Sequence, residues 1–167
     1  MQKACIERTE EVSEIELEEV QKKISDALFK IGLSNQKLAE EFEVSRNVIS
    51  YTINNKRICK ISLLIKVARK RGITLNKFFS ETSQTIKTEE WDENRIYEAI
   101  YNFFRYRPYN ITDTIASSTY RDYRKNEYKY LKDNLNIKTV IELCLTINGD
   151  LLDLLMEGER LYKLHNK

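Results

Sequence analysis

The sequence predicts an all-α protein made of two tandem five-helix domains. Its 167 residues include one proline and four glycines, too few for the many tight turns that a multi-stranded sheet needs. Apolar residues recur at steps of three and four along most of the chain, as on one face of a helix. The composition, 41% hydrophobic and 32% charged, is typical of a globular chain with one or two cores.

Five helices are expected in the first half. They span residues from about 14 to 31, 35–42, 46–53, 61–71 and a last turn that carries Leu75, Phe78 and Phe79. Ser13, Ser34 and Ser45 are the residue type that caps a helix start, and Ser13 opens a capping box. Gly32 and Gly72 can take the left-handed conformation that ends a helix.

A polar linker over 81–90, with Ile86 as its single apolar residue, separates the domains 1–80 and 91–167. In the second domain a stripe of apolar residues precedes Pro108, and further helices are expected at about 112–118, 120–133, 138–147 and after Asp150. Five small or apolar positions recur between the halves at offsets of 76 or 77: Ala39 and Ala116, Ala68 and Cys144, Leu75 and Leu151, Phe78 and Leu154, Phe79 and Leu155. This recurrence predicts two copies of one helical unit.

Several classes of protein are unfavoured by the residues present. Cys5, Cys59 and Cys144 form no Cys-x-x-Cys pair, and the only histidine is His165, so neither a zinc site nor a Ser/His/Asp relay is expected. A Gly-rich phosphate loop is also missing. We therefore expect no enzyme, no cofactor and no metal. The lack of a long apolar run and the glutamate-rich amino end predict a cytoplasmic protein without a membrane span or signal peptide.

The net charge of +2 conceals an uneven distribution. Residues 44–80 contain nine Lys or Arg and no Asp or Glu, whereas residues 7–19 contain seven glutamates and one arginine. A stretch with charge of one sign suits a polyanion such as duplex DNA.

The region 33–50 has the pattern of two short helices that cross closely. Ala39 is small where they cross, and Ser45 can satisfy amide groups at the start of the second helix. The wedge between the helices is filled by Leu38, Phe42, Val44 and Ile49. With its flanking helices, over about residues 20–79, this pattern resembles the helix-turn-helix of the Cro and phage-repressor (XRE-like) type.

The resemblance implies that the third helix enters the major groove of double-stranded DNA. It implies that Arg46, Asn47 and Tyr51 contact the bases, because Arg can form two hydrogen bonds to guanine and Asn two to adenine. The implied phosphate-binding residues are Asn35, Gln36, Ser45, Ser50, Asn54, Lys56 and Arg57. The implied function is a transcriptional repressor, which as a homodimer would read an inverted repeat about one helical turn apart.

Three residues depart from the family pattern. Glu43 stands in the turn where the family usually has glycine, and Asn55 stands in the loop after the third helix, again in place of glycine. Thr52 replaces an apolar core residue. A non-glycine residue in the left-handed region costs about 1 to 2 kcal/mol, and Asn tolerates that region better than most.

The second half lacks the aliphatic wedge and carries a tyrosine- and arginine-rich segment instead. Its candidate contact residues are Tyr120, Arg121, Tyr123, Arg124, Lys125 and Tyr128. They could hold phosphates, form a protein contact or simply pack. The protein contact corresponds to a second function, that of a phage-type protein such as an anti-CRISPR autorepressor, which binds its promoter and a protein target. An RNA or single-strand binder is a third interpretation. The apolar face of residues 150–164 is a candidate dimer contact or part of the core.

Overall fold

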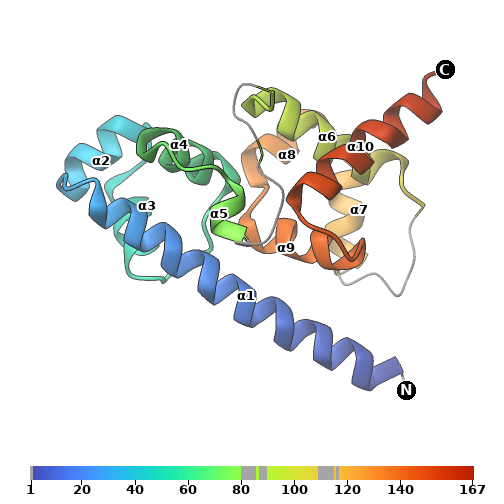
Figure 1. The fold of residues 1–167 in the computed structure, drawn as a ribbon, viewed down its shortest axis with the longest axis horizontal. Helices are drawn as coiled ribbons and strands as arrows, with labels where there is room; N and C mark the ends of the chain where they lie inside the picture. Colours follow the sequence, from blue (N-terminus) through green and yellow to red (C-terminus); the bar gives the residue numbers. More distant parts are fainter. Residues whose placement is uncertain (1, 80–85, 87–89, 109–114, 116) are drawn as a thin grey trace.

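Ten helices make up the part of the chain that the structure describes (Figure 1). The structure is a computed structural model that describes residues 2–79, 86, 90–108, 115 and 117–167. The helices are α1 Gln2–Lys30, α2 Asn35–Phe42, α3 Arg46–Ile53, α4 Ile61–Arg71, α5 Asn76–Phe79, α6 Glu93–Tyr106, α7 Ser117–Lys125, α8 Tyr128–Asn134, α9 Ile137–Thr146 and α10 Leu151–His165. No strand occurs in these residues, so the all-α prediction is confirmed.

Helices α2, α3 and α4 begin and end where the sequence predicts. The Ser34 Oγ accepts the Lys37 N–H at 3.3 Å and so caps α2. The Ser45 Oγ accepts the Val48 N–H at 3.3 Å and caps α3 in the same way. Gly72 ends α4 with a φ of 62°, where a side chain would be strained.

The first helix is longer than predicted. α1 begins at Gln2, and Ser13 lies in its interior at 4% exposure instead of capping its start. The residues before Ser13 contain neither glycine nor proline, so nothing in them stops a helix. α1 also packs along α9, where burial and then the nearby Glu16 carboxylate raise the pKa of the Cys144 thiol. The first helix therefore contacts both halves of the chain.

The middle of the second half also differs from the prediction. The single helix expected over 120–133 is two helices, α7 and α8, separated by Asn126 and Glu127. The Asn126 side chain donates to the carbonyl of Asp122 at 2.7 Å, which satisfies the last turn of α7 without a further helical residue. Most of the helix expected over 112–118 lies outside the described residues.

The last helix begins directly after Asp150, as predicted, and Asp150 forms a capping box with Asp153. The backbone N–H groups of Asp150 and Asp153 donate to each other's carboxylates at 2.9 Å. α10 then packs along α6, and Gly158 lies at the contact, because a Cβ on it would be 1.9 Å from the Ala99 carbonyl oxygen. Most of the apolar face considered for a dimer is thus buried inside the chain, through Leu151, Leu154, Leu155 and Leu161, whereas Leu164 is 49% exposed.

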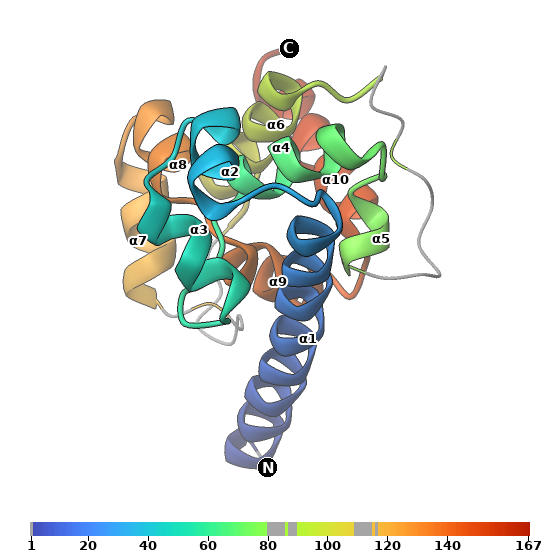
Figure 2. The ribbon, with the colours of Figure 1, turned by 90° about the vertical axis from the view of Figure 1, so that its left-hand side faces the viewer.

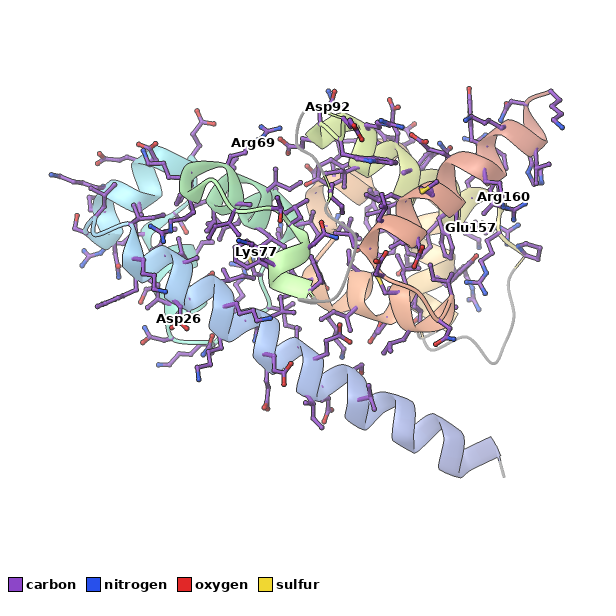
Figure 3. The ribbon with its side chains drawn as sticks, in the orientation of Figure 1. Asp26, Arg69, Lys77, Asp92, Glu157 and Arg160 are labelled. Carbon is purple, nitrogen blue, oxygen red and sulfur yellow. The ribbon has the colours of Figure 1, made fainter. Side chains whose placement is uncertain are left out.

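One hydrophobic core runs through both halves. Its buried residues extend without a break from α1 to α10. Ile86, in the predicted linker, is 1% exposed, and its N–H donates to the Asn76 Oδ1 at 2.6 Å. Arg69 lies on α4 toward α6 (Figure 3), with its Nη1 3.9 Å from the Glu93 carboxylate. Side chains of the two halves therefore pack on each other directly.

Parts of the two halves correspond at a fixed spacing of 76 residues. α1 ends at Lys30 and α6 at Tyr106, and α4 begins at Ile61 and α9 at Ile137. Buried residues correspond at the same spacing, including Val20 and Ile96, Ile24 and Ile100, Leu28 and Phe104, and Ala68 and Cys144. Left-handed residues also recur at this spacing, with Gly72 directly after α4 and Asn148 two residues after α9. The spacing is not kept by the helix pairs in between, α2 with α3 and α7 with α8.

Candidate nucleic-acid interface

Helices α2 and α3 form a closely crossed pair on the surface of the first half. Three residues, 43–45, connect them, and their contact is filled by the residues that the sequence assigned to the wedge. Leu38, Ala39, Phe42 and Ile49 are at most 5% exposed, and Val44 is half-buried. Ser25 Oγ on α1 donates to the Ile53 carbonyl at 2.7 Å and fixes the carboxyl end of α3.

The three departures from the family pattern are accommodated locally. Glu43 does adopt the left-handed conformation, with a φ of 54°, and its N–H donates to the carbonyls that end α2. Asn55 also does so, with a φ of 55°. Thr52 is 5% exposed, and its Oγ1 donates to the Val48 carbonyl at 2.7 Å, so the buried hydroxyl is satisfied. The turn keeps its shape at the cost of strain at Glu43.

The three candidate base readers lie on the exposed side of α3. Arg46 and Asn47 are exposed in its first turn, and Tyr51, one turn later, is 45% exposed. Its exposure, similar to the 48% of Tyr162 on α10, leaves the phenol ring and hydroxyl available for a contact. The first two turns of α3 therefore present a guanidinium, an amide and a phenol to solvent.

The candidate phosphate-binding residues surround these side chains but are not equally available. Ser45 is occupied as the cap of α3 and is still exposed, and Asn35 is half-buried at the start of α2. Gln36 Nε2 donates to the Glu40 carboxylate at 3.0 Å. Asn54 Nδ2 donates to the carbonyl of half-buried Ser50 at 2.8 Å. Lys56 and Arg57 are exposed in the loop after α3 and form no ion pair within the described residues.

The basic residues of the first half divide into two groups. On α4, Lys66 Nζ donates to the Phe42 carbonyl at 2.8 Å, and Lys70 pairs with the Glu41 carboxylate at 2.8 Å. Around α3, by contrast, the cations face solvent without an acidic partner in the part of the chain that is described: Arg46, Lys56, Arg57 and Lys60. One group of unpaired cations therefore lies near α3, and a further four cations, Lys23, Lys30, Arg71 and Lys77, line a separate cleft with Asp26.

Lys60 is the cation that the residue assignments from sequence missed. It lies at the junction of the halves, in a cleft of about 420 Å³ that Arg57 and, from the second half, Lys132 also line. Glu43, Glu93 and Asp133 line the same cleft, so its charge is mixed. Only the run of cations without acids, counted along 44–80, could have pointed to Lys60.

The aromatic candidates of the second half belong mainly to the core. Tyr120 is 1% exposed, and its hydroxyl donates to the Arg107 carbonyl at 3.0 Å. Tyr123 is 6% exposed and stacks on Phe104 with ring centroids 4.9 Å apart, and burial raises its pKa to about 12. Tyr128 is half-buried against Tyr101. The packing alternative thus describes Tyr120 and Tyr123, which cannot form a contact surface.

The cations of the same segment remain exposed. Arg121 and Lys125 lie on the solvent side of α7 and form no ion pair within the described chain. Arg124 is exposed too, with its Nη1 3.5 Å from the Arg107 carbonyl. α7 therefore presents a basic face, interrupted by one exposed acid, Asp122.

Comparisons with known proteins add no relative. No protein-family model matches the chain, and searches of curated proteins and of solved structures found no match. The described helices include none with the length and apolarity to cross a bilayer. Among the described side chains, no group of His, Cys, Asp and Glu could hold a metal ion. Burial raises the pKa of the Cys59 thiol to about 12, so this cysteine is not a ready nucleophile.

Proposed function

We propose that the protein is a sequence-specific regulator of transcription that inserts α3 into the major groove of double-stranded DNA. The observation that carries the proposal is the exposed side of α3, where Arg46, Asn47 and Tyr51 project beside cations that have no acidic partner among the described residues. Arg and Asn side chains can each make two hydrogen bonds to one base. The amino ends of α2 and α3, with Lys56 and Arg57, supply contacts to the phosphates on either side.

In this proposal the chain contains two copies of one repressor-like helical unit. The shared helix ends and buried positions at a spacing of 76 residues support the duplication. The first copy keeps the helix-turn-helix, and the second has lost its wedge. Repression in the cytoplasm follows from the resemblance of the first copy to phage repressors. Most of the α10 face considered for the predicted homodimer packs on α6, and Leu164 at its end stays 49% exposed.

Selection from duplexes with a randomised centre tests the function directly. The wild-type chain should enrich one base pattern, and Arg46→Ala should lose preference at a single position, because one guanine contact contributes about 1 to 3 kcal/mol of discrimination. Lys56→Ala should instead weaken binding on all sequences and lower the slope of log K against log salt by about one unit. Lys163→Ala, an exposed cation on α10, is the control and should change neither quantity.

Failure to enrich any pattern at physiological salt would contradict the proposal. Equal behaviour of Arg46→Ala and Lys56→Ala across all duplexes would contradict the division between base reading and phosphate binding.

A further inference from the structure

The two halves meet through a reciprocal pair of backbone hydrogen bonds. The Ile61 N–H donates to the Leu135 carbonyl, and the Ile137 N–H donates to the Cys59 carbonyl, both at 3.0 Å. Donor Ile61 corresponds to donor Ile137, and acceptor Cys59 to acceptor Leu135, at the same spacing of 76 residues. Each half therefore donates one backbone hydrogen bond to the other half and accepts the equivalent hydrogen bond from it.

Such reciprocity is the property of a twofold axis, familiar from dimers in which residue i contacts j and j contacts i. Here the axis relates two parts of one chain and passes between Lys60 and Asn136, which form the isolated antiparallel bridge. A rotation about this axis moves a helix around the axis but does not move it from one end of the axis to the other. The counterpart of α3 in the second half must therefore lie on the same side of the molecule as α3.

Residues 46–53 of α3 correspond at the 76-residue spacing to 122–129, which covers the second half of α7 and the start of α8. Both α7 and α8 pack on α6, as α3 packs on α1, and we take α7 as the counterpart because of the residues that it buries. Each of the two helices buries a pair of residues three apart, Ile49 with Thr52 and Tyr120 with Tyr123. Figure 2 shows α3 and α7 on one side of the molecule and α5 and α10 on the other. The internal twofold therefore places two solvent-facing helices on one face.

The chemistry of α7 fits phosphates better than bases. Arg121 and Lys125 are exposed one turn apart, and Arg124 is exposed between them. Side chains of this type can neutralise phosphates, whatever the sequence of the DNA. Asp122 is exposed on the same helix, and its carboxylate could accept only from the amino groups of cytosine and adenine among the major-groove edges.

We propose that a single copy of this chain binds duplex DNA through both halves, with α3 reading bases and α7 holding the phosphates of an adjacent stretch. This inference rests on the proposed function for its ligand, and it replaces the second subunit of a homodimer by the second half of the same chain. The binding site is then asymmetric, with a sequence-specific part under α3 and a sequence-independent part under α7.

A pair of charge-matched variants of the full chain tests the α7 contact. Arg121→Gln with Lys125→Gln removes two cations one turn apart on α7, and Lys163→Gln with Lys167→Gln removes two exposed cations at the carboxyl end of α10, which projects away from α3 and α7 in Figure 1. The probe is a random-sequence duplex of about three helical turns. The α7 variant should bind at least about tenfold more weakly at moderate salt, and its salt slope should fall by about two units. The α10 variant should match the wild type.

The outcomes separate this inference from the proposed function. Equal effects of the two variants, or no effect of either, overturn the α7 contact even where Arg46→Ala still alters sequence preference. An α7 variant that binds DNA normally but no longer retains a protein partner supports the bifunctional interpretation and overturns ours. Native mass spectrometry of the wild type with the selected duplex should show one chain per duplex, and a complex with two chains overturns the single-copy assembly.

Discussion

The two halves of this chain share helix ends and buried positions at a spacing of 76 residues. They differ in the side chains that the helices between these positions expose. α1 and α6 end at equivalent residues, α4 and α9 begin at equivalent residues, and the positions that they bury coincide. The helices held between them differ: α3 exposes Arg46, Asn47 and Tyr51, whereas α7 turns two tyrosines inward and leaves cations outside. Buried positions are constrained by packing, while exposed positions on the same scaffold are free to change chemistry.

A second difference lies at the carboxyl ends of the halves. α5 has four residues, whereas α10, which begins within one residue of the equivalent place, has fifteen. The additional length of α10 packs along α6 and gives the second half a large apolar contact that the first half lacks. Stability is therefore expected to depend more on α6 and α10 than on α4 and α5, and DNA binding more on the first half.

The largest expected effect is on the shared core. Ile24 and Ile100 are equivalent and both 0% exposed, so Ile24→Ala and Ile100→Ala should each lower the free energy of unfolding by about 2 to 5 kcal/mol. Because one core runs through both halves, unfolding should remain a single transition. Urea titration followed by circular dichroism, which reports all helices, and by fluorescence of Trp91, the only tryptophan, checks this.

Independent halves would give a different result. Ile24→Ala would then shift the circular dichroism transition and leave the Trp91 transition of the second half in place.

Most of the first half could be predicted from sequence because its signals are local. The bounds of α2, α3 and α4 follow from Ser34, Ser45, Gly72 and the apolar spacing, and each signal acts within one turn of its helix end. The start of α1 could not be predicted, because Ser13 is a residue type that caps helices and yet lies buried inside α1, which packs on α9. Long-range packing decided that position.

The candidate site shows the same division. The exposure of Arg46, Asn47 and Tyr51 follows from the helical phase set by Ile49, which the sequence alone provides. The roles of Tyr120 and Tyr123 depend on Phe104, which is 16 residues or more away in sequence, so local pattern left their packing and contact interpretations open. The reciprocal hydrogen bonds at the junction involve backbone atoms, which no side-chain pattern reports.

The next effect in size concerns the contact unique to the second half. In Gly158→Ala the added Cβ would meet the backbone of Ala99 at 1.9 Å, so α10 and α6 must separate, and we expect a loss of about 2 to 3 kcal/mol. Gly72→Ala in the first half is the matched control. A Cβ there meets nothing within 4 Å, and only the positive φ is penalised, by about 1 kcal/mol. Thermal and urea unfolding of both variants measures the difference, and equal losses would contradict the importance of the α6 and α10 contact.

The smallest expected effect is a gain of stability at the turn between α2 and α3. Glu43 adopts a φ of 54° that glycine adopts without a penalty, so Glu43→Gly should raise the free energy of unfolding by up to about 1 kcal/mol. Asn55→Gly, at a φ of 55°, should gain less, because Asn already tolerates the left-handed region. A loss of stability in Glu43→Gly would mean that the carboxylate contributes more than the backbone strain costs. Because the substitution leaves α3 and its cations in place, DNA affinity should change by less than about twofold, a result that would separate the strain in this turn from the function of the helix it positions.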